Sequence, residues 1–148
     1  LFWSIGVLAE IALFALAGKF KERIGPLTLL TAAALAGVIR WLLLAMLENH
    51  VALFVTQILH CFTFGAAHLG AMTFLSKTIP KDVFATGQGI YYTLVGGVFS
   101  GCMLPVAGFL FTSMAGNAFY FMAILSAFAL GGLYLLSRCS YQNLENEH

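Results

Sequence analysis

The chain has 148 residues, of which 61% are hydrophobic and 9% are charged, and its formal net charge is +1. Soluble domains carry about 25% charged residues, so this composition excludes a soluble globular fold and predicts an all-α integral membrane protein. The distribution of basic and aromatic residues gives no sign of nucleic-acid binding. The cysteines lack metal-ligand spacing and no nucleophile stands in a motif with a base, so we expect no metal, no cofactor and no enzymatic activity.

Five apolar segments follow one another along the chain, and each is long enough to cross a bilayer, which takes about 20 residues of helix. We predict membrane-spanning helices at residues 1–18, 27–46, 51–75, 85–112 and 118–137. The polar breaks between them are short, so successive helices should be antiparallel neighbours. Residues 138–148 form a polar tail.

Positive charge is confined to alternate breaks. The first break, the third break and the tail hold Lys19, Lys21, Arg23, Lys77, Lys81 and Arg138, whereas the second and fourth breaks hold no Lys or Arg. The positive-inside rule then predicts a cytoplasmic C-terminus and an outward start in the cell membrane, the inner membrane of a bacterium. An odd number of spans with an outward start leads us to expect a piece of a longer protein whose N-terminal helices are missing.

The third segment carries polar residues in its middle. At 100° per residue, Gln57, His60, Phe64 and His68 fall within about 80° of one helix face. Polar groups at membrane depth normally face a bundle interior or an aqueous cavity, so this face is predicted to line a site. The alternative is that the two imidazoles are neutral and bond to neighbouring helices.

Two charged residues, Glu10 and Arg40, lie inside apolar segments. A charge at the centre of a spanning helix costs about 2.5–3.5 kcal/mol, so each requires compensation. Residue counts from the segment ends place Glu10 at the depth of His68 and Arg40 at the depth of His60. The pair is either a static ion pair that fixes helix register or part of a cavity in which a carboxylate exchanges a proton. Trp41, next to Arg40 in the sequence, is expected to point in another direction than Arg40 and to serve helix packing.

The fourth segment is less regular than the others. Gln88, Tyr91, Tyr92 and Val95 follow i, i+3, i+4, i+7 spacing, and the tyrosines are either substrate-facing or interfacial anchors. The glycines of this segment, Gly97 and Gly101 among them, predict tight helix packing, with a flexible gating helix as the alternative.

The break after the first segment carries a recognisable motif. Gly18, Glu22, Arg23 and Gly25 stand at the spacing of the cytoplasmic loop motif of the major facilitator superfamily. Glu10, Arg40 and His60 resemble the glutamate, arginine and histidine of the lactose permease. The sequences Trp3 to Ile11, Arg40-Trp41, Leu59 to His68 and Gln88 to Tyr91 are similar to the phenylpropionate-permease type of the superfamily.

This resemblance implies that the chain forms helices eight to twelve of a twelve-helix proton symporter, which needs no cofactor. Its substrate and proton network would contain Glu10 and Arg40 with His60 beside them, and His68 matches the phenylpropionate type. Thr63 stands where the lactose permease has an acidic residue, so a carboxylate there cannot couple proton movement.

An aromatic carboxylate, such as a phenylpropionate-like acid, would bind Arg40 and stack on Phe64 or Tyr92. The expected partners are this solute, a proton, the lipid bilayer and the missing helices. A sugar or nucleoside symporter of the same superfamily remains open, as does a non-transporting membrane protein whose buried charges are structural.

Overall fold

The computed structural model describes the backbone of residues 2–20, 24–47 and 50–145, and within these ranges it is helical and contains no strand. The α-helices are α1 (Phe2–Phe20), α2 (Pro26–Met46), α3 (His50–His60), α4 (Ala67–Thr78), α5 (Phe84–Tyr92), α6 (Ser100–Met114) and α7 (Ala118–Glu145). The all-helical class predicted from the sequence is confirmed. The last helix continues through Glu145 into the polar tail.

Two π-helical segments join helices that the sequence presents as single spans. The first, Cys61–Ala66, connects α3 to α4, and the second, Thr93–Phe99, connects α5 to α6. By length and composition, three helical stretches could cross a membrane: Pro26–Met46, Leu53–Thr78 and Lys81–Arg138, the last of which covers α5 to α7. Gly6–Ala17 is a shorter apolar stretch. The count of five spans therefore stays a prediction.

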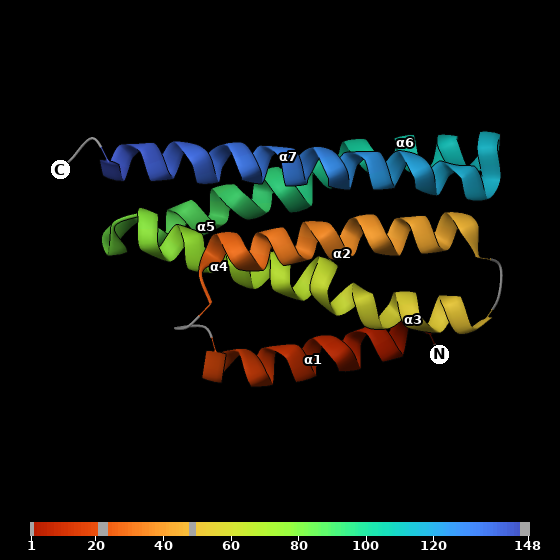
Figure 1. The fold of residues 1–148 in the computed structure, drawn as a ribbon, viewed down its shortest axis with the longest axis horizontal. Coiled ribbons are helices and arrows are strands. Elements are labelled where there is room, and N and C mark those ends of the chain that lie inside the picture. Colours follow the sequence, from red (N-terminus) through yellow and green to blue (C-terminus); the bar gives the residue numbers. More distant parts are fainter. Residues whose placement is uncertain (1, 21–23, 48–49, 146–148) are drawn as a thin grey trace.

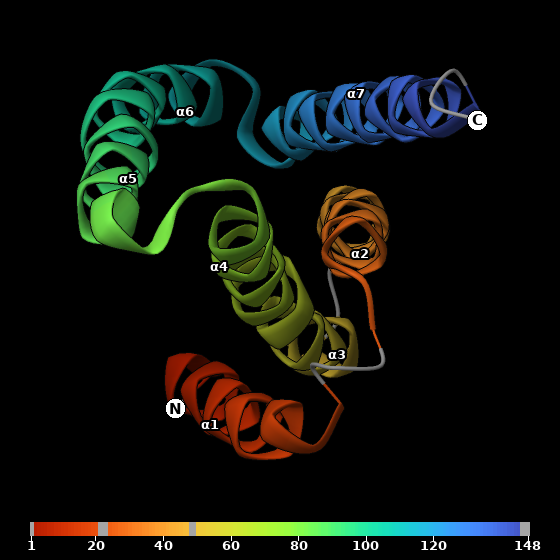
Figure 2. The ribbon, with the colours of Figure 1, turned by 90° about the vertical axis from the view of Figure 1, so that its left-hand side faces the viewer.

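The helices run alternately along the long axis of the molecule (Figure 1). The α4–α5 connection and the C-terminal end of α7 lie at one end, and the α6–α7 connection lies at the other. In the end-on view, α4 lies between α1, α2 and α5, while α7 packs along α2 (Figure 2). The α5–α6 rod stands at the edge of this arrangement, and α5 lies beside α4 (Figure 2).

Local backbone chemistry sets the helix ends. Pro26 begins α2, because the fixed φ of proline fits the first position of a helix. Gly25, directly before it, is the N-cap and has an extended conformation (φ −65°, ψ 151°). Ile79 is extended before Pro80 and ends α4, since a residue preceding proline avoids the helical region. Ala115 has a positive φ of 49° at the turn from α6 into α7, a conformation that is rare without glycine.

Small residues fill the contacts between the helices. Gly37 of α2 lies against Ser126 of α7, and a Cβ added to Gly37 would be 2.9 Å from the serine oxygen. Gly70 of α4 lies against Leu30 of α2, and a Cβ added to Gly70 would be 2.9 Å from Cγ of Leu30. The buried apolar side chains are Ala33, Ala36, Cys61, Ala66, Ala118 and Ala123. Small residues allow helix backbones to approach closely, which is how helices associate in a membrane.

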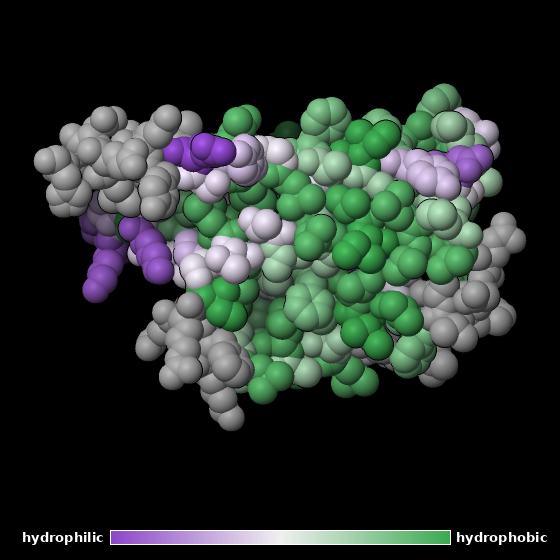
Figure 3. Space-filling view, viewed as in Figure 1, coloured by the Kyte–Doolittle hydropathy of each residue, from purple (hydrophilic) through white to green (hydrophobic). Residues whose placement is uncertain are grey.

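The large apolar side chains face outward instead. Leu104, Phe109 and Phe128 are each at least 70% exposed. Hydrophobic residues cover the middle of the visible face, and hydrophilic residues gather toward its ends (Figure 3). This is the surface of a protein whose solvent is lipid. The tight packing expected at Gly97 and Gly101 is not found with any described residue, because an added Cβ at either position would meet nothing within 4 Å.

Candidate functional site

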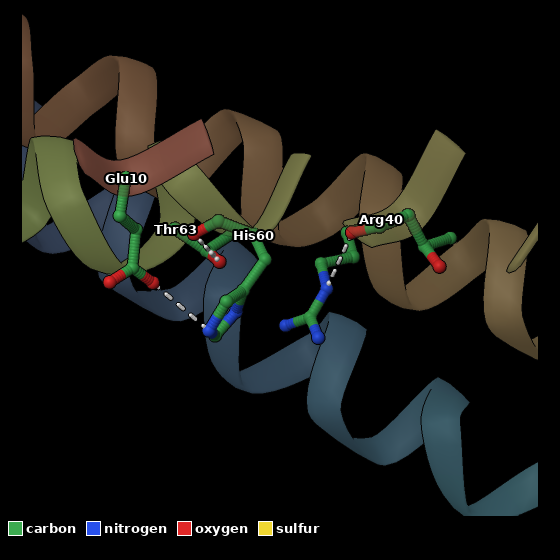
Figure 4. A network of polar contacts seen from close by, with 5 residues as sticks. Glu10, Arg40, His60 and Thr63 are labelled. Atoms are coloured by element: carbon green, nitrogen blue, oxygen red, sulfur yellow. Dashed lines mark hydrogen bonds and ion pairs between the residues drawn. The ribbon is translucent and has the colours of Figure 1, made fainter. Parts of the chain in front are cut away.

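His60 and Glu10 form an ion-pair contact between α3 and α1. The Nε2 atom of His60 lies 3.2 Å from Oε1 of Glu10, and the two side chains are 26% and 16% exposed (Figure 4). Gly6 makes this contact possible, because an added Cβ there would lie 3.3 Å from Cδ2 of His60. The glycine thus lets α1 approach α3 closely enough for a short carboxylate side chain to reach the imidazole.

The residue counts placed Glu10 at the depth of His68, but in the structure Glu10 lies beside His60. Phe14, one turn after Glu10, faces His68 instead, with ring centroids 6.1 Å apart in an edge-on arrangement. The residue counts assumed parallel helices with uniform α-helical geometry. In the structure, α1 is inclined to the α3–α4 rod (Figure 1), and the π-helical segment between His60 and His68 changes the register.

Arg40 extends from α2 toward the other side of His60. Its Nε donates a hydrogen bond of 3.1 Å to the carbonyl oxygen of Thr56, and the terminal end of its guanidinium group points toward His60 (Figure 4). His60 therefore lies between a carboxylate and a guanidinium group. Its Nδ1 atom is buried and has no hydrogen-bond partner among the described residues. His60 can therefore form a further hydrogen bond through Nδ1, and Arg40 can donate further hydrogen bonds through its terminal nitrogens.

An aromatic pocket begins one turn beyond His60. The rings of His60 and Phe64 are stacked with centroids 6.0 Å apart, and Phe64 is one wall of the pocket. The cavity has a volume of about 340 Å³ and is lined by Thr63, Phe64, Ala67, His68, Tyr91, Tyr92, Val95, Gly96 and Ser100. Across it, the Tyr92 hydroxyl lies 3.4 Å from Nε2 of His68. The pocket therefore adjoins the row formed by Glu10, His60 and Arg40 (the charged row), because the Phe64 ring borders the pocket and stacks on His60.

Both π-helical segments contribute to this pocket. The first supplies Thr63 and Phe64, and the second supplies Val95 and Gly96. Segments of π-helix inside α-helices are rare and occur frequently at functional sites, because they redirect side chains. The hydroxyl of Thr63 donates to the carbonyl of His60, and Ser100 donates to the carbonyl of Val95.

Sequence reasoning did not assign Thr63 and Ser100 to the site. Each hydroxyl residue stands in an apolar run and has no ionisable neighbour in sequence, so a residue-by-residue reading gives it no signal. The sequence therefore carries no signal that could have found them. Tyr91 did stand in the i, i+3, i+4, i+7 pattern, and it lines the pocket beside Tyr92.

The remaining predicted site residues lie apart from the pocket. Gln57 is near α1, with Oε1 3.7 Å from an added Cβ on Gly6. The amide of Gln88 donates to the sulfur of Met72 at 3.2 Å, which ties α5 to α4 rather than bringing Gln88 into the pocket. Among the described residues no group of histidine, cysteine and carboxylate side chains could hold a metal ion.

The predicted loop motif is only partly visible. Glu22 and Arg23 lie outside the described residues, and the structure describes Gly18 only as part of the backbone of α1. Gly25 is the N-cap of α2. The motif therefore stays a prediction from the sequence.

Ionisable groups that meet inside an apolar helical bundle, beside a pocket, are typical of membrane transporters, which hold their substrate and coupling-ion sites near mid-membrane. The sequence matches the model of the MFS_1 like family over residues 1–123, and the chain belongs to this family of the major facilitator superfamily. The superfamily consists of membrane transporters rather than enzymes.

Similarity to a curated protein supports the family assignment. The chain is 34% identical over 124 residues to the "Probable 3-phenylpropionic acid transporter" of Escherichia coli (strain K12), an alignment that covers 84% of this chain and 32% of the relative. The chain thus spans about a third of the length of that relative. No solved structure matches the chain with statistical significance.

Proposed function

We propose that the chain forms part of a proton-coupled symporter for a small aromatic carboxylate. One observation carries the proposal: the row of Glu10, His60 and Arg40 lies beside a pocket with aromatic walls. The row offers a fixed positive charge and a group that can exchange a proton. The pocket offers a place for an aromatic ring.

The substrate would be held at two points. Its carboxylate would bind the guanidinium of Arg40, a group that suits carboxylates because of its planar, forked set of donors. Its ring would enter the cavity and lie against Phe64 and Tyr92. A volume of about 340 Å³ lies at the small end of ligand pockets, which span about 300–1,000 Å³, so a single ring with a short chain is a suitable size. The name of the relative, a 3-phenylpropionic acid transporter, refers to a molecule of this kind.

The coupled proton would be carried by the Glu10–His60 pair. Thr63 has no ionisable group, so it cannot hold the proton, and the carboxylate and imidazole are the titratable groups in contact here. A negative substrate beside Arg40 would change the electrostatic balance around His60 and Glu10. Proton uptake and substrate binding would thereby be linked.

The orientation of the chain also belongs to this proposal. Lys77, Lys81 and Arg138 are exposed and belong to the end of the bundle that holds the α4–α5 connection and the end of α7. By the positive-inside rule this end would face the cytoplasm. Helices from the rest of the full-length protein would supply the other wall of the substrate cavity.

Uptake by the full-length protein tests the proposal. The substrates are 3-phenylpropionate, its neutral amide and a sugar, and the variants are Arg40→Ala and Arg138→Ala. Wild type should accumulate the acid in preference to the other two, and Arg40→Ala should lower acid uptake at least about 100-fold, because a buried carboxylate loses its cation partner. Arg138→Ala, which removes an exposed arginine of α7 whose described partner is Tyr134, should transport like wild type. Preference for the sugar, or normal acid uptake by Arg40→Ala, would refute the proposal.

A further inference from the structure

The three nitrogens of the Arg40 guanidinium group are not equivalent. Nε donates to the carbonyl oxygen of Thr56 at 3.1 Å, so one side of the fork is already used within the protein. Thr56 is completely buried, and its hydroxyl donates to the carbonyl of Leu53 at 2.8 Å. The acceptor of the Arg40 bond is therefore a backbone atom held in place by α3, and not a mobile side chain.

A second contact fixes the face of the guanidinium group. Its central carbon, Cζ, lies 4.7 Å from the ring centroid of Trp41, a cation–π distance. The Trp41 ring is itself stacked on Phe119 of α7, with centroids 5.9 Å apart and an angle of 16° between the planes. Because α2 packs along α7, the position of the Trp41 ring is set by a neighbouring helix. Trp41 therefore packs between helices as expected, but the expectation that it points away from Arg40 is wrong.

These two contacts leave the terminal nitrogens, Nη1 and Nη2, without a hydrogen bond to any described residue. In Figure 4 one of these two nitrogens points toward His60 and the other points away from α2 and α3. A carboxylate can accept two parallel hydrogen bonds from the terminal nitrogens of an arginine. The alternative approach, through Nε and one terminal nitrogen, is blocked because the Nε proton is directed at Thr56.

We propose that Trp41 is a positioning residue for Arg40, so that the substrate carboxylate binds end-on, through Nη1 and Nη2 together. This inference rests on the proposed function, because it assumes that Arg40 binds the substrate anion. A guanidinium group held in advance loses less conformational freedom when the carboxylate arrives, and this preorganisation increases affinity for the anion specifically. A neutral ligand gains nothing from it.

The test compares substitutions at Trp41 in the full-length transporter. Trp41→Leu should raise KM for 3-phenylpropionate about tenfold with little change in maximal rate, the size expected for a desolvated cation–π contact. Inhibition by 3-phenylpropanamide should be unchanged. Trp41→Phe keeps an aromatic face and should restore KM to within about threefold of wild type. Phe128→Leu, which removes an outward-facing ring of α7, is the matched control and should leave both ligands unaffected.

Phe119→Leu provides an independent variant. It removes the ring on which Trp41 stacks, so it should raise KM for the acid about threefold and leave the amide unchanged. If Trp41→Leu fails to reach the membrane, the KM of Phe119→Leu tests the positioning role of Trp41 instead.

The outcomes separate this inference from the proposed function. Normal KM for the acid in Trp41→Leu and Phe119→Leu, or an equal loss for acid and amide, overturns the positioning role while the Arg40→Ala result still supports transport of a carboxylate. If Arg40→Ala transports the acid like wild type, both proposals fail.

Discussion

At the scale of single residues, one imidazole connects the charges of three helices. His60 contacts the carboxylate of Glu10 on α1 and faces the guanidinium of Arg40 on α2. Either charge alone would cost about 2.5–3.5 kcal/mol at the centre of a spanning helix, so the three groups lower one another's cost by lying together. The same closeness places the three groups within each other's electrostatic field, which the proposed coupling requires.

Their chemistry was predictable from the sequence, but their pairing was not. An ionisable residue in an apolar run is conspicuous, so Glu10, Arg40 and His60 could be identified from the sequence alone. Which residue meets which depends on helix inclination and on the π-helical segment, and neither leaves a mark in the hydrophobic pattern. The support of Arg40 by Trp41 also depends on α7, far away in the chain.

Tyr92 provides a residue-scale prediction for the pocket. Tyr92→Phe keeps the aromatic wall and removes only the hydroxyl near His68, so KM for 3-phenylpropionate should change less than about twofold. Tyr92→Ala removes the wall and should raise KM about fivefold, the value of one aromatic contact. Transport kinetics with both variants check this. Equal KM values for the two variants would show that the ring does not contact the substrate.

At the scale of helices, glycine determines how closely the elements approach. Three glycines leave room for a side chain of a neighbouring helix. Those side chains are His60 at Gly6, Ser126 at Gly37 and Leu30 at Gly70. The apolar segments predicted from the sequence overlap the observed helices, because apolar length and proline or glycine breaks are local signals. The last helix, α7, nevertheless continues to Glu145, beyond the predicted end at residue 137. The sequence could not tell contact glycines from open ones, since both stand in the same kind of helix. Gly70 is at a contact, whereas an added Cβ at Gly97 would meet no described atom within 4 Å.

A pair of substitutions tests this distinction. In Gly70→Ala the new methyl group would lie 2.9 Å from Cγ of Leu30 and 3.1 Å from Cβ of Leu29, so α2 and α4 must separate. We expect a destabilisation of about 1–3 kcal/mol, seen as a lower Tm of the purified full-length protein. Gly131→Ala, in α7, meets no described atom within 4 Å and should be neutral or slightly stabilising. The account of the packing is wrong if both variants melt alike.

At the scale of the whole molecule, the described part of the bundle has an apolar outer surface and a polar row in its interior. Large apolar side chains cover the outside, hydrophilic residues gather toward the ends, and Glu10, Arg40 and His60 meet inside (Figures 3 and 4). The chain spans about a third of the length of its curated relative. In the proposed function, helices outside this chain would complete the substrate cavity. In the proposed mechanism those helices and these would move relative to each other while the charged row remains intact.

The central claim is that the Glu10–His60 pair couples proton movement to the substrate, and Glu10→Gln tests it most directly. The glutamine keeps the size of the side chain but cannot take up a proton. In proteoliposomes containing the full-length protein, wild type should accumulate 3-phenylpropionate when a pH gradient is imposed. Glu10→Gln should lose this accumulation and still exchange labelled for unlabelled substrate across the membrane. Wild-type accumulation driven by the pH gradient in Glu10→Gln would contradict the account.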